Sequence, residues 1–321
     1  MRFVVYGAGA IGGVIGGRLF EAGHDVTLIA RGEHEQALRS GGLVVGSPDR
    51  TVTLDVPVAG HPGDAGLAPG DVVVLAVKSQ DTAAAVHALA AAAPDGVAVV
   101  CAQNGVDNER IALRSFADVY AMHVMCPATH LEPGVVMAHS APVTGILDLG
   151  RYPAGVDATA AAVVDALAGA TFASEARPDI MRWKHAKLLL NLSNAVDAVC
   201  GARDEAAREL SAAVRAEGEA CLRAAGLDAV PRDEDRARRG DLLTLAPVDG
   251  MRHRGSSSWQ SLVRGVGTIE TDYLNGEIVL LGRLHGVPTP ANELLQRLAR
   301  DLAVRGRPPG EMAAADVLAR L

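Results

Sequence analysis

The sequence predicts an α/β fold, in which an N-terminal Rossmann-like doubly wound sheet is followed by an all-helical C-terminal domain. A glycine motif connects an apolar strand to a helix near the start of the chain. Continuous apolar runs at 71–77 and 97–101 are typical of parallel strands buried on both faces. Strand signals disappear after Asp179. Because 321 residues exceed one ordinary core, we expect two domains, of residues 1–175 and 176–321.

The glycine motif G-x-G-x-x-G lies in the segment VVYGAGAIGG, residues 4–13. In this motif Gly7 permits a tight strand-to-helix turn, Gly9 lets the backbone approach a pyrophosphate, and Gly12 lets the helix pack closely on the strand. The helix N-terminus would then hold the pyrophosphate, since its N–H groups and its dipole favour an anion. We therefore expect a dinucleotide site formed by Gly7, Ala8, Gly9, Ala10, Ile11 and Gly12.

The composition indicates a globular protein and excludes several classes of partner. Asp and Glu outnumber Lys and Arg by 38 to 30, and the net charge of −8 argues against a nucleic-acid surface. A strand rather than a signal peptide starts the chain, and no apolar run reaches about 18 residues. We therefore expect a cytoplasmic protein without a membrane partner. The four cysteines lack metal-ligand spacing, so we expect thiols and no metal.

The end of the second predicted strand, at residues 25–30, indicates which dinucleotide is bound. Arg31 follows this strand, and an arginine there can pair with the 2′-phosphate of NADP. An acidic residue would instead bind the 2′-hydroxyl of NAD. The sequence therefore favours NADP, while Glu33 and Glu35 close by keep NAD as the alternative.

Lys78 and Asn104 follow the two apolar runs closely along the chain. Ligands in open α/β sheets bind outside the carboxyl ends of the strands, so we expect both residues beside the cofactor. For Asn104 the alternative is a plain turn residue, because Asn-Gly is a common turn pair.

The remaining segments of the first domain predict structure without chemistry. Two short strands, 43–45 and 52–54, are joined by a Gly-Ser-Pro-Asp turn into a hairpin that we expect inside the wound sheet. Strands without intervening helices predict an antiparallel edge, at 119–125, 135–138 and 144–149. We expect a helix at 156–168 to cover this edge and the segment 171–178 to be the hinge to the second domain.

Lysine is rare in this chain: of 30 Lys and Arg residues, three are lysines, namely Lys78, Lys184 and Lys187. A lysine among arginines can mark a position that needs a compact ammonium able to donate a proton, and for only three residues chance is the alternative. Lys187, Asn191 and Asn194 have the spacing i, i+4, i+7 on a helix predicted over 183–194, so they share one face. This polar stripe either faces solvent or lines a wet cleft.

Helices dominate the predictions for the rest of the second domain. A helix at 204–225 ends at the cap residue Gly226, and the charged segment 232–239 is expected to be solvated. The segment 255–260, GSSSWQ, predicts a helix N-terminus at which serine hydroxyls cap N–H groups or share them with an anion. We expect this helix to continue through 268–277 and to end near His285.

Together these motifs resemble the ketopantoate reductase (2-dehydropantoate 2-reductase) family, over nearly the whole chain. The motifs that carry the resemblance are 7–13, Val77-Lys78, Gln103-Asn104-Gly105, the Lys187-x-x-x-Asn191 helix, the serine cluster and 270–276. The resemblance implies NADPH-dependent reduction of a small 2-oxo acid in a cleft between the domains, with a homodimer as one option for the assembly. It implies that Lys187 is catalytic with Glu270 as its acidic counterpart, and that the substrate is held by Asn104, Asn191, Asn194 and Ser258 or Ser257.

Two departures from the family pattern concern the substrate side. Asn194 follows Asn191 by three residues rather than four, and Ser258-Trp259-Gln260-Ser261-Leu262 stands where the family has Ser-Met-x-Gln-Asp. The resemblance makes ketopantoate the first candidate substrate. Because both departures concern the substrate side, another 2-oxo acid is the alternative. A non-catalytic NADPH-binding regulator is a third hypothesis, against which the presence of Lys187 and Glu270 counts.

Overall fold

The computed structural model describes residues 1–201, 204–251, 255–265 and 267–321. The described residues form two compact units. The first comprises Met1–Gln103, Asp107–Met181 and Asp233–His253, and the second comprises Asn104–Val106, Arg182–Arg232 and Arg254–Leu321. The predicted division into domains of residues 1–175 and 176–321 remains a prediction about which segments fold on their own.

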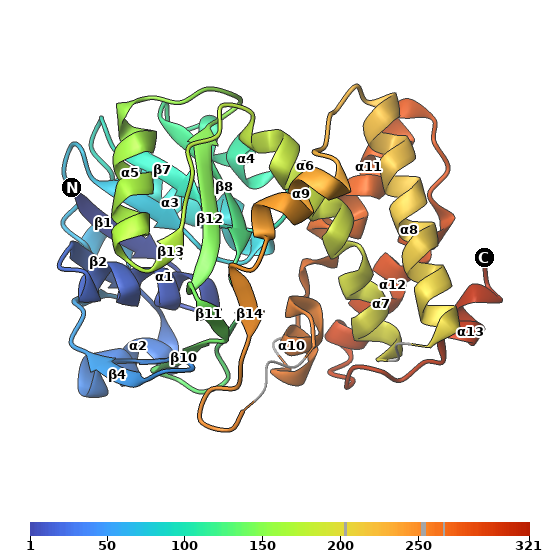
Figure 1. The fold of residues 1–321 in the computed structure, drawn as a ribbon, viewed down its shortest axis with the longest axis horizontal. Coiled ribbons are helices and arrows are strands. Elements are labelled where there is room, and N and C mark those ends of the chain that lie inside the picture. The colour runs from blue at the N-terminus through green and yellow to red at the C-terminus, as the bar shows by residue number, and fades with distance from the viewer. Residues whose placement is uncertain (202–203, 252–254, 266) are drawn as a thin grey trace. The chain divides into compact units, whose positions relative to one another are not determined.

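The first unit is built on a mixed sheet with the strand order β13-β12-β8-β7-β6-β1-β2-β5 (Figure 1). The strands from β5 to β8 are parallel, and β12 is antiparallel to β8. The order β5-β2-β1-β6-β7-β8 reverses direction at β1, as in a doubly wound dinucleotide-binding sheet, and confirms the predicted fold class. The strands are β1 (Arg2–Tyr6), β2 (Asp25–Ile29), β5 (Val58–Ala59), β6 (Val72–Leu75), β7 (Ala98–Cys101), β8 (Val119–Met125), β12 (Gly145–Arg151) and β13 (Phe172–Ala173).

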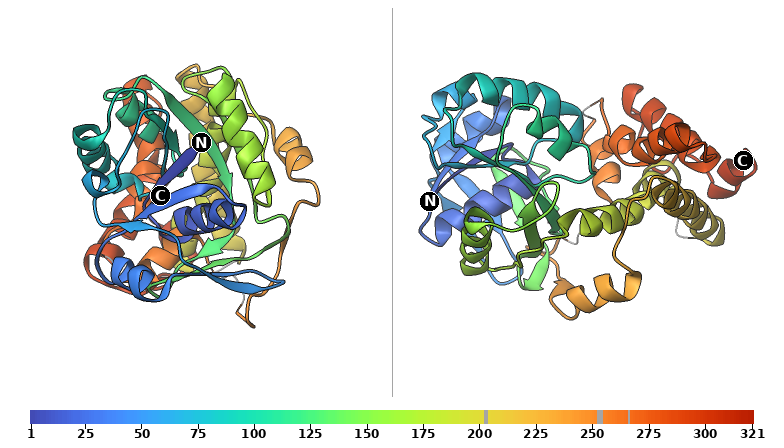
Figure 2. Two further views of the ribbon diagram at one scale, coloured as in Figure 1. Left: turned by 90° about the vertical axis from the view of Figure 1, so that its left-hand side faces the viewer. Right: turned by 90° about the horizontal axis from the view of Figure 1, so that it is seen from above.

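Helices cover both faces of this sheet, with α3 and α4 on one face and α1 and α5 on the other (Figure 2). Alternate residues of β1 serve the two cores: Phe3 and Val5 belong to the core with α1 and α5, and Val4 belongs to the core with α3 and α4. Two-sided burial explains the continuous apolar runs in the sequence. The helices are α1 (Ala10–Glu21), α3 (Thr82–Ala92), α4 (Asn108–Leu113) and α5 (Ala158–Gly169).

The hairpin predicted inside the wound sheet forms, but in a different sheet. Strands β3 (Leu43–Gly46) and β4 (Thr51–Leu54) pair antiparallel within the order β4-β3-β10-β9, together with β9 (Ala128–Thr129) and β10 (Val135–Ala138). This small sheet packs against α1, where an added Cβ on Gly17 would lie 2.7 Å from Cγ2 of Val45. The glycines of α1 thus let a second sheet approach the helix, and β10 is not at the edge of the main sheet.

Residues 232–239 were expected to be solvated: five of them are exposed, but Asp235 is buried and the Arg238 side chain is 9% exposed. They form α9 (Arg232–Arg239), whose Arg238 donates from Nε and Nη2 to the carboxylate of Asp148 at 2.9 and 2.6 Å. Asp148 is fully buried in β12. A buried carboxylate requires a charge partner, which Arg238 of α9 supplies together with Arg177, whose Nε lies 3.6 Å from Asp148 Oδ2.

Two further strand predictions are corrected. β14 (Leu243–Leu245) pairs antiparallel with β11 (Ser140–Pro142), so strands do occur after Asp179. The segment predicted as a hinge, 171–178, contains β13, which pairs in parallel with β12 at the end of the main sheet. Both strands are too short for a periodic pattern, so partners distant in sequence determine them.

The second unit is helical and contains α6 (Ile180–Asn191), α7 (Ser193–Cys200), α8 (Glu205–Ala224), α10 (Ser257–Val263), α11 (Asn275–His285), α12 (Pro290–Val304) and α13 (Ala314–Leu318). The helix predicted at 204–225 is confirmed as α8, and the carboxylate of its N-cap Asp204 accepts a hydrogen bond from Ala207 N. Glu217 of α8 accepts hydrogen bonds from the N–H groups of Ala291 and Asn292 at the start of α12, where an anion is favourable. Within the described part of the chain, no helix combines the length and apolarity needed to cross a bilayer.

Candidate active site

The predicted glycine loop joins β1 to α1, and each of its glycines is needed for a different geometric reason. Gly7 has φ +101°, and an added Cβ on Gly12 would lie 2.0 Å from the carbonyl oxygen of Gly7. An added Cβ on Gly9 would meet no atom within 4 Å. Gly7 and Gly12 are therefore required by the fold itself, whereas Gly9 borders open space in which a ligand backbone contact can form.

The N-terminus of α1 suits an anion. Its N-cap is Gly9, which has no capping side chain, and the first turn carries no acidic residue. The first N–H groups of a helix lack intrahelical partners, and the helix dipole makes this end positive. The loop and the helix start thus fit a pyrophosphate, as the motif predicts.

Arg31 lies where the sequence predicts, between β2 and α2 (Gly32–Gly41), with 86% of its side chain exposed. Its Nη2 is 3.3 Å from Oδ2 of Asp81, which the sequence analysis did not identify. Burial raises the pKa of the Tyr6 hydroxyl, and the nearby Arg31 charge acts in the opposite direction. Since an exposed ion pair contributes little stability, Arg31 can exchange Asp81 for a phosphate at small cost.

Lys78 and the residues around it are held by a buried polar network. Lys78 is half-buried directly before the 3-10 turn Ser79–Asp81. Gln103 Nε2 donates to Val77 O at 2.9 Å and to Oγ1 of Thr82 at 2.7 Å, and Thr82 Oγ1 donates to Asn108 Oδ1 at 2.7 Å. These hydrogen bonds fix the segments that carry Lys78 and Asn104. Gln103 therefore supports the site, and only the tertiary structure reveals Thr82 as its partner and Asn108 as the partner of Thr82.

Two residues predicted to bind substrate are brought into contact. Asn191 Nδ2 donates to Asn104 Oδ1 at 3.1 Å, although 87 positions separate them. Asn191 is 6% exposed, and Asn104 is half-buried. A side-chain amide can both donate and accept hydrogen bonds, which suits it to a polar ligand.

Lys187 is half-buried on α6, one turn before Asn191. Its neighbour Lys184 is 3% exposed, and the neighbouring His185 donates from Nδ1 to the carbonyl of Asp228 at 2.7 Å. Burial lowers the pKa of His185, while the hydrogen bond to Asp228 acts in the opposite direction. Of the two lysines on this helix, Lys187 is therefore the more accessible to a substrate.

The helix predicted to carry all three polar residues is broken, which corrects the sequence analysis. α6 ends at Asn191, and Asn194 belongs to α7. Side chains bind the carbonyls at the break: Ser193 Oγ donates to Leu190 O at 2.9 Å, and Asn275 Nδ2 donates to Leu192 O at 3.1 Å. Such side-chain bonds compete with the helical pattern. Asn194 thus stands on α7 and not on the helix of Lys187, and its substrate role stays a prediction.

Residues 256–258 form the serine cluster, in which Ser256 has a structural role and Ser258 is a candidate for binding a ligand. Ser256 is the N-cap of α10, and its Oγ accepts from Trp259 N at 3.2 Å while its own N–H donates to Asp197 at 2.7 Å. Ser257 and Ser258 form the first turn. Ser258 is 2% exposed, and within the described part of the chain its Oγ has no hydrogen-bond partner. A buried hydroxyl without a partner is unfavourable, so of the two predicted serines Ser258 is the better candidate for contact with a ligand.

The helix predicted from the serines to His285 is interrupted. α10 ends at Val263, Glu270 begins a 3-10 turn (Glu270–Tyr273), and α11 starts at Asn275. Gly265 and Gly267 have φ of +62° and +73°, which an α-helix cannot include.

Glu270 is 4% exposed at the start of this 3-10 turn. Arg264 is an additional charged residue there: burial lowers the pKa of its guanidinium, and the Glu270 charge acts in the opposite direction. Arg264 was not predicted as a site residue, because nothing in its local pattern distinguishes it from the other arginines. It supplies a cation that attracts Glu270, the residue predicted to be the acidic counterpart of Lys187.

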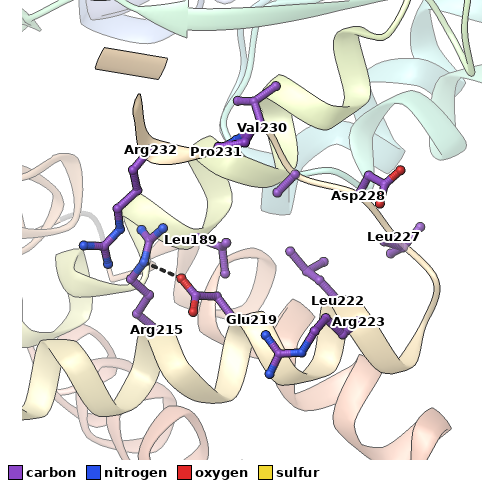
Figure 3. Close-up of a pocket in the computed structure, with 11 residues that line it drawn as sticks. Leu189, Arg215, Glu219, Leu222, Arg223, Leu227, Asp228, Val230, Pro231 and Arg232 are labelled. Atoms are coloured by element: carbon purple, nitrogen blue, oxygen red, sulfur yellow. Dashed lines mark hydrogen bonds and ion pairs between the residues drawn. The ribbon is translucent and has the colours of Figure 1, made fainter. Parts of the chain in front are cut away.

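A separate pocket of about 380 Å³ opens between α8 and the segment that follows it (Figure 3). Arg215 donates there to Glu219 at 2.7 Å. The apolar and charged residues that line it are Leu189, Arg215, Glu219, Leu222, Arg223, Leu227, Asp228, Ala229, Val230, Pro231 and Arg232. None of the predicted site residues is among them. Among the described residues, no group of three or more His, Cys, Asp or Glu side chains could hold a metal ion.

Solved structures share this fold over nearly the whole chain. A PanE/ApbA family ketopantoate reductase from Ralstonia eutropha JMP134 is 30% identical, with a TM-score of 0.81 over 95% of this chain and 99% of that one. A D-mandelate dehydrogenase, solved with NADH and anilino(oxo)acetate, reaches the same TM-score of 0.81 over the same shares at 21% identity. The latter similarity concerns the fold alone.

Sequence comparison is more specific. The family model for ketopantoate reductase PanE/ApbA matches residues 3–153, and the model for its C-terminal part matches residues 179–303. The 2-dehydropantoate 2-reductase of Halobacterium salinarum is 32% identical over 94% of this chain and 98% of that protein. The enzyme of that name from Pyrococcus horikoshii is 29% identical over 94% and 97%. The chain therefore belongs to the ketopantoate reductase family of oxidoreductases.

Proposed function

We propose that this protein reduces a 2-oxo acid to a 2-hydroxy acid with NADPH, and that ketopantoate is the substrate, giving pantoate for pantothenate biosynthesis. The Asn191–Asn104 hydrogen bond is the observation that supports this most directly. It connects Asn104, three residues after the end of β7, to α6, the helix that carries Lys187. Polar groups predicted separately to bind cofactor and substrate are thus neighbours, in a chain of the matching family.

The first unit supplies a fitting cofactor site. The pyrophosphate would bind the loop of Gly7, Ala8 and Gly9 and the helix start at Ala10, Ile11 and Gly12, since this loop borders open space and this helix end lacks a capping side chain. Arg31 would bind the 2′-phosphate in place of Asp81, and Lys78 would lie towards the nicotinamide end. Asn104, which belongs to the second unit, is a further candidate for binding the cofactor. When bound, NADPH supplies the hydride.

The second unit supplies the acid. Hydride transfer to the 2-oxo carbon leaves negative charge on the carbonyl oxygen, which needs stabilisation and a proton. The Lys187 ammonium would provide both, and Glu270 would keep it charged and oriented. Asn104 and Asn191 would donate neutral hydrogen bonds, with Asn194 as a further candidate. Ser258, with its unpartnered hydroxyl, would bind the substrate carboxylate, with Ser257 as the alternative.

A different 2-oxo acid is the second candidate. Trp259 stands in the serine motif where the family has Met, and the structurally similar D-mandelate dehydrogenase was solved with a bulkier 2-oxo compound and with NADH. A changed pocket volume alters discrimination by about 10- to 200-fold per methylene-sized difference, so such a change can redirect preference.

Steady-state oxidation of NADPH and NADH with ketopantoate, pyruvate and phenylglyoxylate tests the proposal. We expect the highest kcat/KM for ketopantoate with NADPH. A higher value for phenylglyoxylate would establish the second candidate. Tight NADPH binding without oxidation by any 2-oxo acid would contradict the enzymatic proposal and support a non-catalytic regulator.

A further inference from the structure

His34, in the first turn of α2, connects two backbone segments that are far apart in sequence. Its Nε2 lies 2.7 Å from the carbonyl oxygen of Ala8 in the glycine loop, and its Nδ1 lies 2.9 Å from the N–H of Gly134. A carbonyl can only accept a hydrogen bond and an N–H can only donate one. The ring is therefore neutral, with its proton on Nε2 and the lone pair of Nδ1 facing Gly134.

The His34 side chain is half-buried, and neighbouring groups pack against it. The ring of His130 lies beside it, with centroids 4.3 Å apart and planes tilted by 53°, and His130 Nδ1 donates to Val135 O at 3.1 Å. Gly134 has φ +81°, and an added Cβ there would lie 3.2 Å from Cβ of Ala37 in α2. The turn before β10 thus packs closely on α2 and holds His34 from the side opposite to the glycine loop.

The hydrogen bond from His34 to Ala8 O determines the direction of the Gly9 N–H in the glycine loop. The peptide between Ala8 and Gly9 is planar and trans, so the carbonyl of Ala8 and the N–H of Gly9 point in opposite directions. By holding the carbonyl towards α2, His34 directs the Gly9 N–H away from it. An added Cβ on Gly9 would meet no atom within 4 Å, so the loop is open at this residue.

We propose that His34 is a positioning residue, which orients the Ala8–Gly9 peptide so that the Gly9 N–H is aimed at a cofactor phosphate. This inference rests on the proposed binding of a dinucleotide. His34 itself touches no reacting atom. It acts through the glycine loop, and it ties that loop to α2, at whose N-cap Arg31 stands.

Protonation of His34 would remove the acceptor for Gly134 and set two donors against each other. Burial lowers the pKa of His34, and the hydrogen bond to Ala8 acts in the opposite direction. The charged and titratable groups on the packed elements are Arg31, Glu33, Glu35 and Arg39 of α2 and His130 and Glu132 of the turn, while the glycine loop carries none. The neutral ring therefore makes both of its hydrogen bonds above the ordinary histidine pKa of about 6.5. The bond from Gly134 N–H is lost as the pH falls through the lowered pKa of His34.

NADPH dissociation constants and melting temperatures of His34 variants test this. His34→Gln keeps a donor at the position of Nε2, His34→Asn keeps only a group at the position of Nδ1, and His34→Ala keeps neither. We expect His34→Ala and His34→Asn to raise the Kd about fivefold to tenfold, as for a lost hydrogen bond, and His34→Gln to raise it less than about threefold. His87→Asn, at an exposed position of α3, is the matched control and should bind as wild type does.

The pH dependence provides a readout that a purely structural role would not change. Wild type should lose NADPH affinity between about pH 7.5 and about pH 5.5 more steeply than His34→Gln, which cannot titrate. Equal Kd values for wild type and His34→Ala would overturn the inference, as would His34→Gln binding as weakly as His34→Asn. If His34→Ala does not fold, the Gln and Asn variants still decide. Wild type that binds neither NADPH nor NADH would instead overturn the proposed cofactor site.

Discussion

The glycine loop of the first unit and the lysine helix of the second unit are candidate sites built in opposite ways. The loop acts through its backbone, and its key residues are glycines, which have no side chain. An added Cβ on Gly12 would lie 2.0 Å from Gly7 O. The lysine helix acts through side chains, such as the amide of Asn191 that bonds Asn104. The difference teaches that adding atoms should damage the first site, whereas removing atoms should damage the second.

The largest effect is expected at Lys187, where the loss of one ammonium removes the proposed acid. Lys187→Ala should lower kcat at least about 10²-fold on the best substrate, as is typical of general acid catalysis, with little change in melting temperature. Lys187→Arg should not restore turnover, because a guanidinium releases its proton too reluctantly and has another shape.

Glu270→Ala provides the control for Lys187. If the two residues act as a unit, Glu270→Ala costs less in the Lys187→Ala background than in wild type. A near wild-type kcat for Lys187→Ala, or small and additive effects, would falsify the assignment of the side-chain site.

The backbone site should fail when one methyl group is added. Gly12→Ala introduces a Cβ 2.0 Å from Gly7 O and 3.0 Å from Cβ of Ala76, so the strand and helix must separate. We expect a loss of about 1 to 3 kcal/mol in the free energy of unfolding, measured in urea, together with weaker NADPH binding. Gly41→Ala in α2 is the matched control, since its added Cβ meets no atom within 4 Å. Equal stability of the two variants would contradict this description of the loop.

Cofactor choice should depend on one exposed side chain beside the backbone site. Arg31→Glu should raise the Kd for NADPH about tenfold or more, as for a charge-assisted hydrogen bond, and should change that for NADH much less. Asp81→Asn removes the carboxylate 3.3 Å from Arg31 and should leave NADPH binding unchanged or tighter. Wild type that binds both cofactors equally would show that Arg31 does not discriminate.

The smallest effect concerns pH and the buried His185 of α6. Burial lowers the pKa of His185 in the folded protein, so its contribution to stability is present above the unfolded value of about 6.5. This contribution is lost as the pH falls through the folded pKa, because the unfolded chain then binds more protons. His185→Asn keeps a donor for Asp228 O but cannot titrate.

Urea unfolding at about pH 7.5 and about pH 5.5 measures this difference. The variant should lose less stability than wild type between the two values. An identical loss in both proteins would mean that other groups control the acid sensitivity of the helical unit.

The sequence alone determined the parts whose information is local. Strand, glycine turn and helix follow one another within residues 2–21 as predicted, because the permitted backbone angles of glycine and the periodicity of apolar residues act over a few positions. Arg31, Lys78 and Asn104 were located for the same reason, since each stands close after a strand that its own apolar run predicts. The order of the elements also sufficed for the doubly wound sheet.

Only the tertiary structure decided which buried polar groups meet. The break between α6 and α7, the contact of helix α9 with Asp148 and the separate sheet of β3 and β4 all depend on residues tens of positions away. A buried donor or charge must find a partner to offset its desolvation, and the folded arrangement of whole elements determines which partner is in reach. The local sequence pattern does not indicate which elements are neighbours in the fold. Asn104 and Asn191 were therefore each predicted as site residues, but their contact was not.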